Sequence, residues 1–142
     1  MPRYIYPLYI LIDNSGSMAK EVNGQKLIDL ARLIPSELLE LYEKDNTLVH
    51  SLRVAIIDFN YETNTLQTLG PIPRLRNLKG AKDPAGKTYF SVAFDEVRSQ
   101  IIRDYKLSED SMTSPPESSS DDIMMKPVVL IVTDGIPSDQ PE

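Results

Sequence analysis

The sequence contains no cysteine and no tryptophan, and it contains a single histidine, His50. Without cysteine the chain can form neither a disulfide framework nor a cysteine-ligated zinc site, and this composition fits a reducing compartment. His50 has no second histidine or cysteine as a partner, so we expect it in a solvated or strand-edge position rather than in a catalytic one.

Long hydrophobic runs and an excess of positive charge are also missing. The apolar stretch at residues 4–12 is too short to span a bilayer and lacks the cleavage pattern of a signal peptide. The formal net charge of −6 repels phosphate backbones and acidic membrane surfaces. We therefore expect a cytoplasmic protein of one globular domain, residues 1–142, that binds neither nucleic acid nor membranes.

Two periodicities alternate along the chain. The apolar run at residues 4–12 is typical of a strand covered on both faces, as in a parallel sheet. Residues 52–59 and the wholly apolar residues 128–132 are also predicted strands, and residues 65–69 form a further one after a hairpin-like turn. Apolar residues at three- and four-residue spacing predict helices over 25–42 and 89–105. Pro35 is expected to kink the first helix near residues 31–34.

The remaining segments are expected to connect these elements. Residues 70–85 are rich in Pro, Gly and basic residues, and residues 108–122 are acidic and rich in Ser and Pro, which predicts a mobile loop within the domain. The alternation of strands and helices predicts an α/β sandwich with a largely parallel central sheet. Ligands of such sheets gather at the carboxyl ends of the strands.

Oxygen-bearing side chains follow two of these predicted strands. The run at residues 13–17 (DNSGS) comes directly after the first strand, Asp134 follows the last, and Thr88 stands at the start of the second helix, as an N-cap should. Carboxylate and hydroxyl oxygens suit hard cations, and a small hydroxyl-rich loop suits Mg²⁺ better than Ca²⁺. The sequence therefore predicts a metal site formed by Asp13, Ser15, Ser17, Thr88 and Asp134.

These residues, in this order, resemble the metal-ion-dependent adhesion site of von Willebrand factor type A (vWA) domains. The resemblance covers essentially the whole chain and is greatest to bacterial TerY-like proteins, which are linked by name to tellurite resistance. It implies a Rossmann-like vWA sandwich in which the two serines bind Mg²⁺ or Mn²⁺ directly, with Ca²⁺ less favoured. The threonine and the two aspartates would join directly or through water.

The resemblance also implies a function. One coordination position would stay open for an aspartate or glutamate of a partner protein. The chain would then be a protein-binding module and not an enzyme, and a stress-response or tellurite-resistance assembly is the kind of complex that the resemblance suggests for it. A vWA domain continues beyond this point through further helices and a strand, whereas this sequence stops at Glu142. We expect a C-terminally incomplete domain with strand order 3-2-1-4, whose apolar edge at Pro127–Val132 self-associates or is completed by another chain.

Other hypotheses remain open. Asp13 is a candidate nucleophile of a Mg²⁺-dependent phosphoryl-transfer enzyme, although Ser15 stands where haloacid-dehalogenase-type phosphatases carry a second aspartate. The chain is alternatively a structural half of a split domain, and an Asp-x-Ser-x-Ser run can also serve only to cap backbone N–H groups in a turn. Residues 80–88 have five residues between their glycines where a phosphate-binding P-loop has four, so nucleotide binding is not expected.

Overall fold

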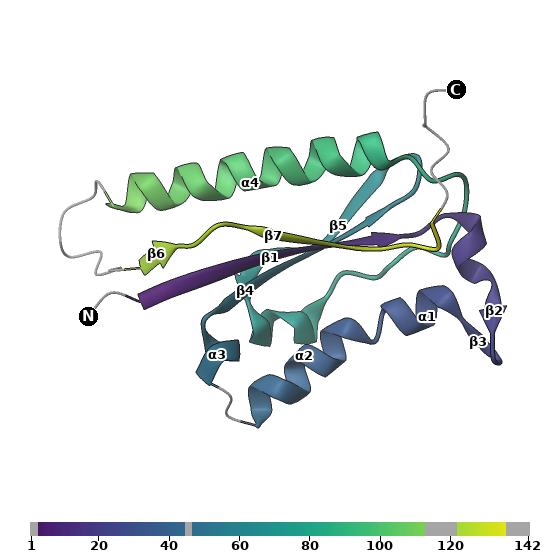
Figure 1. Cartoon of the computed structure of the whole chain (residues 1–142), viewed down its shortest axis with the longest axis horizontal. Helices are drawn as coiled ribbons and strands as arrows, with labels where there is room; N and C mark the ends of the chain where they lie inside the picture. The colour runs from purple at the N-terminus through teal and green to yellow at the C-terminus, as the bar shows by residue number, and fades with distance from the viewer. Residues whose placement is uncertain (1–2, 45–46, 113–121, 136–142) are drawn as a thin grey trace.

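The computed structural model describes residues 3–44, 47–112 and 122–135. A central sheet lies between α4 on one face and the shorter helices on the other (Figure 1). Its strands are β1 (Arg3–Asp13), β4 (Leu52–Phe59), β5 (Thr63–Pro71), β6 (Asp122–Met124) and β7 (Val128–Val132). The helices are α1 (Leu27–Ala31), α2 (Ile34–Glu43), α3 (Thr47–His50) and α4 (Phe90–Met112), with 3-10 helices η1 (Gly16–Ala19) and η2 (Ile72–Asn77).

β1 is the central strand of the sheet. It pairs in parallel with β4 on one side and with β6 and then β7 on the other, so the described strands follow the order β5-β4-β1-β6/β7. This is the expected order 3-2-1-4. A strand with neighbours on both sides and helices on both faces has little contact with water, which explains why its residues are apolar on both faces.

Pro7 lies inside β1 without interrupting it. The backbone N–H of Tyr6 points toward β4, where it donates to the carbonyl of Ser51 at 3.0 Å. Successive N–H groups of a strand point in opposite directions, so the missing N–H of Pro7 lies on the β6/β7 side. There β6 pairs with β1 only as far as Ile5, and β7 begins at Leu8. The proline therefore occupies the gap between two partner strands, where no donor is required.

The two faces of the sheet belong to two hydrophobic clusters. Ile10 and Ile12 of β1 pack with residues of η1, α1 and η2, whereas Tyr9 and Leu11 pack beneath α4. This alternation follows from the two-residue period of a strand. All four side chains are almost completely buried. The core therefore holds the end of β1, and Asp13 with it, in a fixed position.

The sheet is mixed, which corrects the expected Rossmann-like vWA sandwich. β5 runs antiparallel to β4, and β2 (Glu21–Val22) with β3 (Gln25–Lys26) forms a second, two-stranded antiparallel sheet. The physical reason is the length of the connections, because a turn of a few residues can join only antiparallel strands. Asn23 and Gly24 both adopt positive φ in the β2–β3 turn, so the segment predicted to open a helix at residue 25 instead forms a hairpin.

The predicted helices are confirmed with changes at their ends. The first is interrupted between α1 and α2, at the place where Pro35 was expected to distort it, and Pro35 lies in the first turn of α2. α4 continues to Met112, so residues 108–112, expected in the mobile loop, are helical. The rest of that loop, residues 113–121, lies outside the described residues, and Asp122 begins β6.

No helix in the described part of the chain is long and apolar enough to cross a membrane. The cytoplasmic location stays a prediction. His50 lies at the end of α3, exposed, with its ring 4.2 Å from the ring of Tyr42 between centroids. It is remote from the strand ends that carry the polar residues described next.

Candidate functional site

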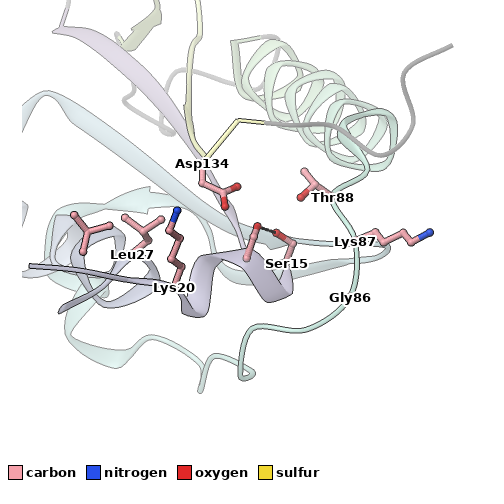
Figure 2. A pocket seen from close by; sticks show the side chains of 9 residues that line it. Ser15, Lys20, Leu27, Gly86, Lys87, Thr88 and Asp134 are labelled. Carbon is pink, nitrogen blue, oxygen red and sulfur yellow. Dashed lines mark hydrogen bonds between the residues drawn. The ribbon is translucent and has the colours of Figure 1, made fainter. Parts of the chain in front are cut away.

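A cavity of about 620 Å³ opens at the carboxyl ends of β1 and β7. Figure 2 shows Ser15, Thr88 and Asp134 around it, contributed by the turn after β1, the segment before α4 and the end of β7. The carboxyl ends of parallel strands meet at one edge of the sheet, and α4 begins at the same edge. This arrangement brings together side chains that are far apart in the sequence.

Asp13 lies beneath the cavity and is 0% exposed. Its Oδ1 accepts a hydrogen bond from the backbone N–H of Ser15 at 2.9 Å, and its Oδ2 accepts one from the Thr133 hydroxyl at 2.7 Å. The Thr88 hydroxyl donates to the same Oδ2 at 3.3 Å. A carboxylate with several donors is a strong hydrogen-bonding centre. Asp13 therefore positions the turn and two hydroxyls, and it does not itself face the solvent.

Ser15 and Ser17 present their hydroxyls side by side. The two Oγ atoms are hydrogen-bonded to each other at 3.0 Å. The turn that places them is closed by a hydrogen bond from the N–H of Met18 to the carbonyl of Ser15, at 3.0 Å, and the buried Met18 side chain anchors η1 in the core. Ser15 is buried and Ser17 is exposed, so the pair extends from the floor of the cavity to its rim.

The loop before α4 is attached to the end of β1 through the backbone. The N–H of Gly16 donates to the carbonyl of Gly86 at 2.9 Å, and the N–H of Ala85 donates to the carbonyl of Asn14 at 3.0 Å. Gly86 has φ +76°, and a Cβ there would lie 2.9 Å from the ring of Tyr61. Glycine is required at this point for both reasons. The attachment fixes the position of Thr88, two residues further on.

Arg32 and Asp58 form a second polar cluster behind this loop. The Nη2 atom of Arg32 donates to Asn14 Oδ1 at 3.1 Å and to the carbonyl of Lys82 at 2.8 Å, and it lies 3.4 Å from Asp58 Oδ2. Asp58 Oδ1 and Arg32 Nε are buried without a hydrogen-bond partner. Burial raises the pKa of Asp58 to about 6, and the Arg32 guanidinium opposes this effect only in part.

Two lysines stand at the rim of the cavity. Figure 2 shows Lys20 extending toward the side on which Asp134 lies, whereas Lys87 points away from the cavity. The formal charges of Lys20, Lys87, Asp134 and the underlying Asp13 cancel. The carboxylate of Asp13 lies beneath the hydroxyl groups, whereas the Lys87 ammonium group points away, so the floor of the cavity favours a cation over an anion.

The donor set can be compared with the needs of a metal ion. Among the described residues, no three His, Cys, Asp or Glu side chains come close enough to hold a metal ion together. The oxygens available are the hydroxyls of Ser15, Ser17 and Thr88, with the carboxylates of Asp13 and Asp134. Oxygen atoms of this kind suit Mg²⁺ or Mn²⁺ and give no particular affinity for softer metals.

The structure brings the five predicted site residues together at one edge of the sheet. Ser15, Ser17, Thr88 and Asp134 line the cavity together, and Asp13 lies below them. Thr88 precedes the first residue of α4 by two positions, so it is not the residue directly before the helix. Thr133 was missed, although a hydroxyl between a strand and Asp134 was a visible signal. Arg32 and Asp58 were also missed, because each lies in an ordinary amphipathic or apolar segment.

The chain shows no match to any family model or to any curated protein. It is similar to a PilB minor pilin from Streptococcus sanguinis at 15% identity and TM-score 0.43, over 63% of this chain and 24% of that one. The type V pilus tip protein Mfa5 from Porphyromonas gingivalis has 16% identity and TM-score 0.45, over 70% of this chain and 17% of that one. An uncharacterized membrane-spanning protein from Vibrio fischeri has 13% identity and TM-score 0.48, over 70% of this chain and 51% of that one.

These comparisons correct the family expectation. The solved structures named above are pilus proteins and an uncharacterized membrane-spanning protein, and no family model matches. The assignment to the vWA family, to tellurite resistance and to a metal-dependent adhesion module is therefore wrong. The chain spans only 17 to 51% of the length of these structures, and likeness at this level transfers no activity to it. The physical reason for the error lies in residues 13–17, where Asp13 and Ser15 form a local turn by hydrogen bonding, as many unrelated turns do.

Proposed function

We propose that the cavity at the ends of β1 and β7 binds a divalent cation, Mg²⁺ or Mn²⁺ in preference to Ca²⁺. The observation that carries this proposal is the 3.0 Å separation of the Ser15 and Ser17 Oγ atoms. Two neighbouring ligands of an octahedral ion, each at about 2.1 Å, are separated by about 3.0 Å. The hydroxyl pair thus already has the spacing that Mg²⁺ requires, and the longer bonds of Ca²⁺ would spread it.

The other residues have distinct parts in this proposal. The Thr88 hydroxyl donates to Asp13 and lines the cavity, which places its oxygen among the candidate ligands. Asp134 is exposed at the rim and supplies a carboxylate that is able to move toward the ion. Asp13 acts from beneath, since its negative charge stabilises a cation that is held mainly by neutral hydroxyls. The bound cation would supply a fixed positive charge at the sheet edge.

We infer a binding site rather than a catalytic one. A phosphoryl-transfer enzyme would need Asp13 as an accessible nucleophile. Asp13 is fully buried, and its oxygens accept hydrogen bonds from Ser15, Thr88 and Thr133. Attack on a substrate phosphorus would require those bonds to break and the cavity floor to open. Hydrolysis of a generic phosphate ester in Mg²⁺ that is lost in Asp13→Asn would contradict this inference.

The test is the thermal stability of the chain in EDTA and in millimolar Mg²⁺, Mn²⁺ or Ca²⁺. A ligand present at 100 times its dissociation constant stabilises the folded state by about 2.7 kcal/mol. At roughly 3 °C per kcal/mol for a domain of this size, the melting temperature should rise by about 8 °C. We expect Mg²⁺ and Mn²⁺ to produce this rise and Ca²⁺ to produce less.

Matched variants assign the effect to the site. Ser15→Ala and Ser17→Ala should each abolish most of the rise, because each removes one of the two paired ligands. Ser99→Ala, which removes an exposed hydroxyl from α4, should leave it intact. Isothermal titration with Mn²⁺ measures the affinity directly. If all four proteins respond equally, or if none binds Mn²⁺ in titration, the proposal is wrong.

A further inference from the structure

β7 forms an edge of the sheet that is apolar and open. It pairs with β1 on one side, and no strand of the described residues pairs with it on the other. Val128 is 59% exposed and Leu130 is 43% exposed, with Val129 between them also exposed. Edges of this kind are unusual because their free N–H and C=O groups invite further strands.

The opposite edge shows how this chain protects a strand. β5 has the sequence TNTLQTLGP, in which polar residues outnumber the two leucines and Pro71 ends the strand. Polar residues and proline at an edge discourage pairing with other chains. β7 has the sequence VVLIV and no such protection. The two edges of one sheet therefore differ in the sense expected if only β7 is a contact surface.

The layers on both faces of the sheet also present apolar groups beside β7. On one face, a cavity of about 290 Å³ lies between Leu30 and Ile34 of the short helices and Val132. On the other face, α4 directs Gln100 toward β5 and Tyr105 toward the segment after β6, since these side chains bond to Thr65 and to the carbonyl of Met125.

Helical spacing places two further residues of α4 on the flank of Tyr105. Phe94 and Ile102 lie eleven and three residues before it, about three turns and one turn away. Both are exposed, Ile102 at 58%. A strand that paired with β7 would therefore meet apolar groups on both of its faces. The occupant must itself be apolar on both faces, as β7 is.

Charge decides between possible occupants. If a second copy of β7 pairs antiparallel with the first about a twofold axis at Leu130, Lys126 of one copy lies opposite Asp134 of the other, at both ends of the ladder. Both residues are exposed, and neither forms an ion pair within the described part of the chain. In the same register Pro127, which lacks an N–H, lies opposite Thr133 beyond the end of the strand. The strand is thus complementary to itself in both shape and charge.

We propose that two copies of this chain associate through β7, antiparallel, with Leu130 at the twofold axis and with Lys126–Asp134 pairs at the two ends. The two sheets then form one continuous sheet. The apolar groups of α1 and α4 beside each edge cover the strand of the partner. This association shares Asp134 with the cation site proposed above. It is therefore tested in EDTA, where no cation competes for that carboxylate and the two proposals fail separately.

Sedimentation velocity over a range of protein concentrations tests the dimer. The parent chain should pass from monomer to dimer as concentration rises. Leu130→Lys places two ammonium groups together at the axis and should raise the dimer dissociation constant at least about 100-fold. Leu41→Lys is the matched control, because Leu41 on α2 is 44% exposed and Leu130 is 43% exposed. A parent chain that stays monomeric, or a dimer that tolerates Leu130→Lys, would overturn the proposal.

Two further variants test the register. Lys126→Asp alone and Asp134→Lys alone should each weaken the dimer, and the double variant should restore it, because the pair is then reversed but intact. Leu130→Cys introduces the chain's single cysteine, and under oxidation it should cross-link the dimer, since directly opposed antiparallel residues have Cα separations that a disulfide can bridge. Absence of rescue together with absence of cross-linking would show that β7 pairs in another register or with another strand.

Discussion

Replacing Asp58 by asparagine should stabilise the protein at neutral pH, although it removes a partner of Arg32. Asp58 is 1% exposed, its Oδ1 has no hydrogen-bond partner, and the nearest atom of Arg32 is 3.4 Å from Oδ2. One long contact to a guanidinium that also serves Asn14 and Lys82 offsets only part of the cost of burying the charge. Asparagine keeps the shape of the side chain and carries no charge.

The magnitude follows from the pKa. Burial raises the pKa of Asp58 from 3.8 to about 6, against the opposing effect of Arg32. The folded protein therefore holds this proton more tightly than the unfolded chain does, and ionised Asp58 costs stability. The cost is absent below about pH 4, grows as the pH rises to about 6, and is constant above that. Since one pKa unit corresponds to about 1.4 kcal/mol, the full cost is at most about 3 kcal/mol.

Urea denaturation of the parent and of Asp58→Asn, at several values between about pH 4 and pH 8, measures this effect. The variant should gain about 1 to 3 kcal/mol in the free energy of unfolding at neutral pH, and the gain should disappear toward pH 4. Asp95→Asn removes an exposed carboxylate from α4 and should change stability by less than about 0.5 kcal/mol throughout. A variant that becomes less stable as the pH rises would refute the reasoning, because the Arg32 contact would then outweigh the burial.

Two other variants test the packing around the site. Tyr9→Phe removes a hydrogen bond of 2.8 Å from a buried hydroxyl to Asp104 and should cost about 1.5 to 3 kcal/mol in urea denaturation; a loss below about 0.5 kcal/mol would contradict this. Gly86→Ala combines a positive φ with a clash against Tyr61, whereas Gly24→Ala has a positive φ of +81° and no atom within 4 Å. The free energy of unfolding should fall by about 1 kcal/mol in the Gly24 variant and by clearly more in the Gly86 variant. Equal losses in the two variants would show that the Tyr61 contact is unimportant.

The strands that were predicted best are those whose apolar run is distinct from the neighbouring polar residues. Residues 52–59 are mostly apolar and residues 128–132 are wholly apolar, and both are strands within those limits. β6 was missed because three residues at the end of an acidic segment carry no strand periodicity. β6 pairs with β1, and the Arg3 side chain donates two hydrogen bonds to Asp122, 119 residues away. A contact of that separation is invisible to local patterns.

The ends of helices were predicted less well for a related reason. The apolar spacing that predicted the second helix stops at Tyr105. α4 continues to Met112, and the residues after Tyr105, Lys106-Leu107-Ser108-Glu109, include good helix formers. Hydrophobic periodicity reports where a helix touches the core, whereas propensity and capping decide where it stops.

The location of the candidate site could be predicted from the sequence, but its hydrogen bonds could not. The edge at which residues 13–17, Thr88 and Asp134 meet followed from the order of strands and helices. The hydrogen bonds that organise them did not, because Thr133 and Arg32 act across tertiary contacts. The same limit explains the wrong family assignment, since a short Asp-x-Ser-x-Ser run is as consistent with a locally bonded turn as with a family signature.

The central position of β1 has a consequence for the synthesis of this protein. β1 leaves the ribosome before the other described strands, but Thr133, which bonds to Asp13, is 120 residues away. At about 5 to 20 residues per second, the interval between the two is about 6 to 24 s. For that time the nascent chain carries an apolar strand whose partner β7 is still being made. Variants that slow translation between residues 13 and 133 would prolong this exposure, and chaperone dependence rather than native stability would decide their yield.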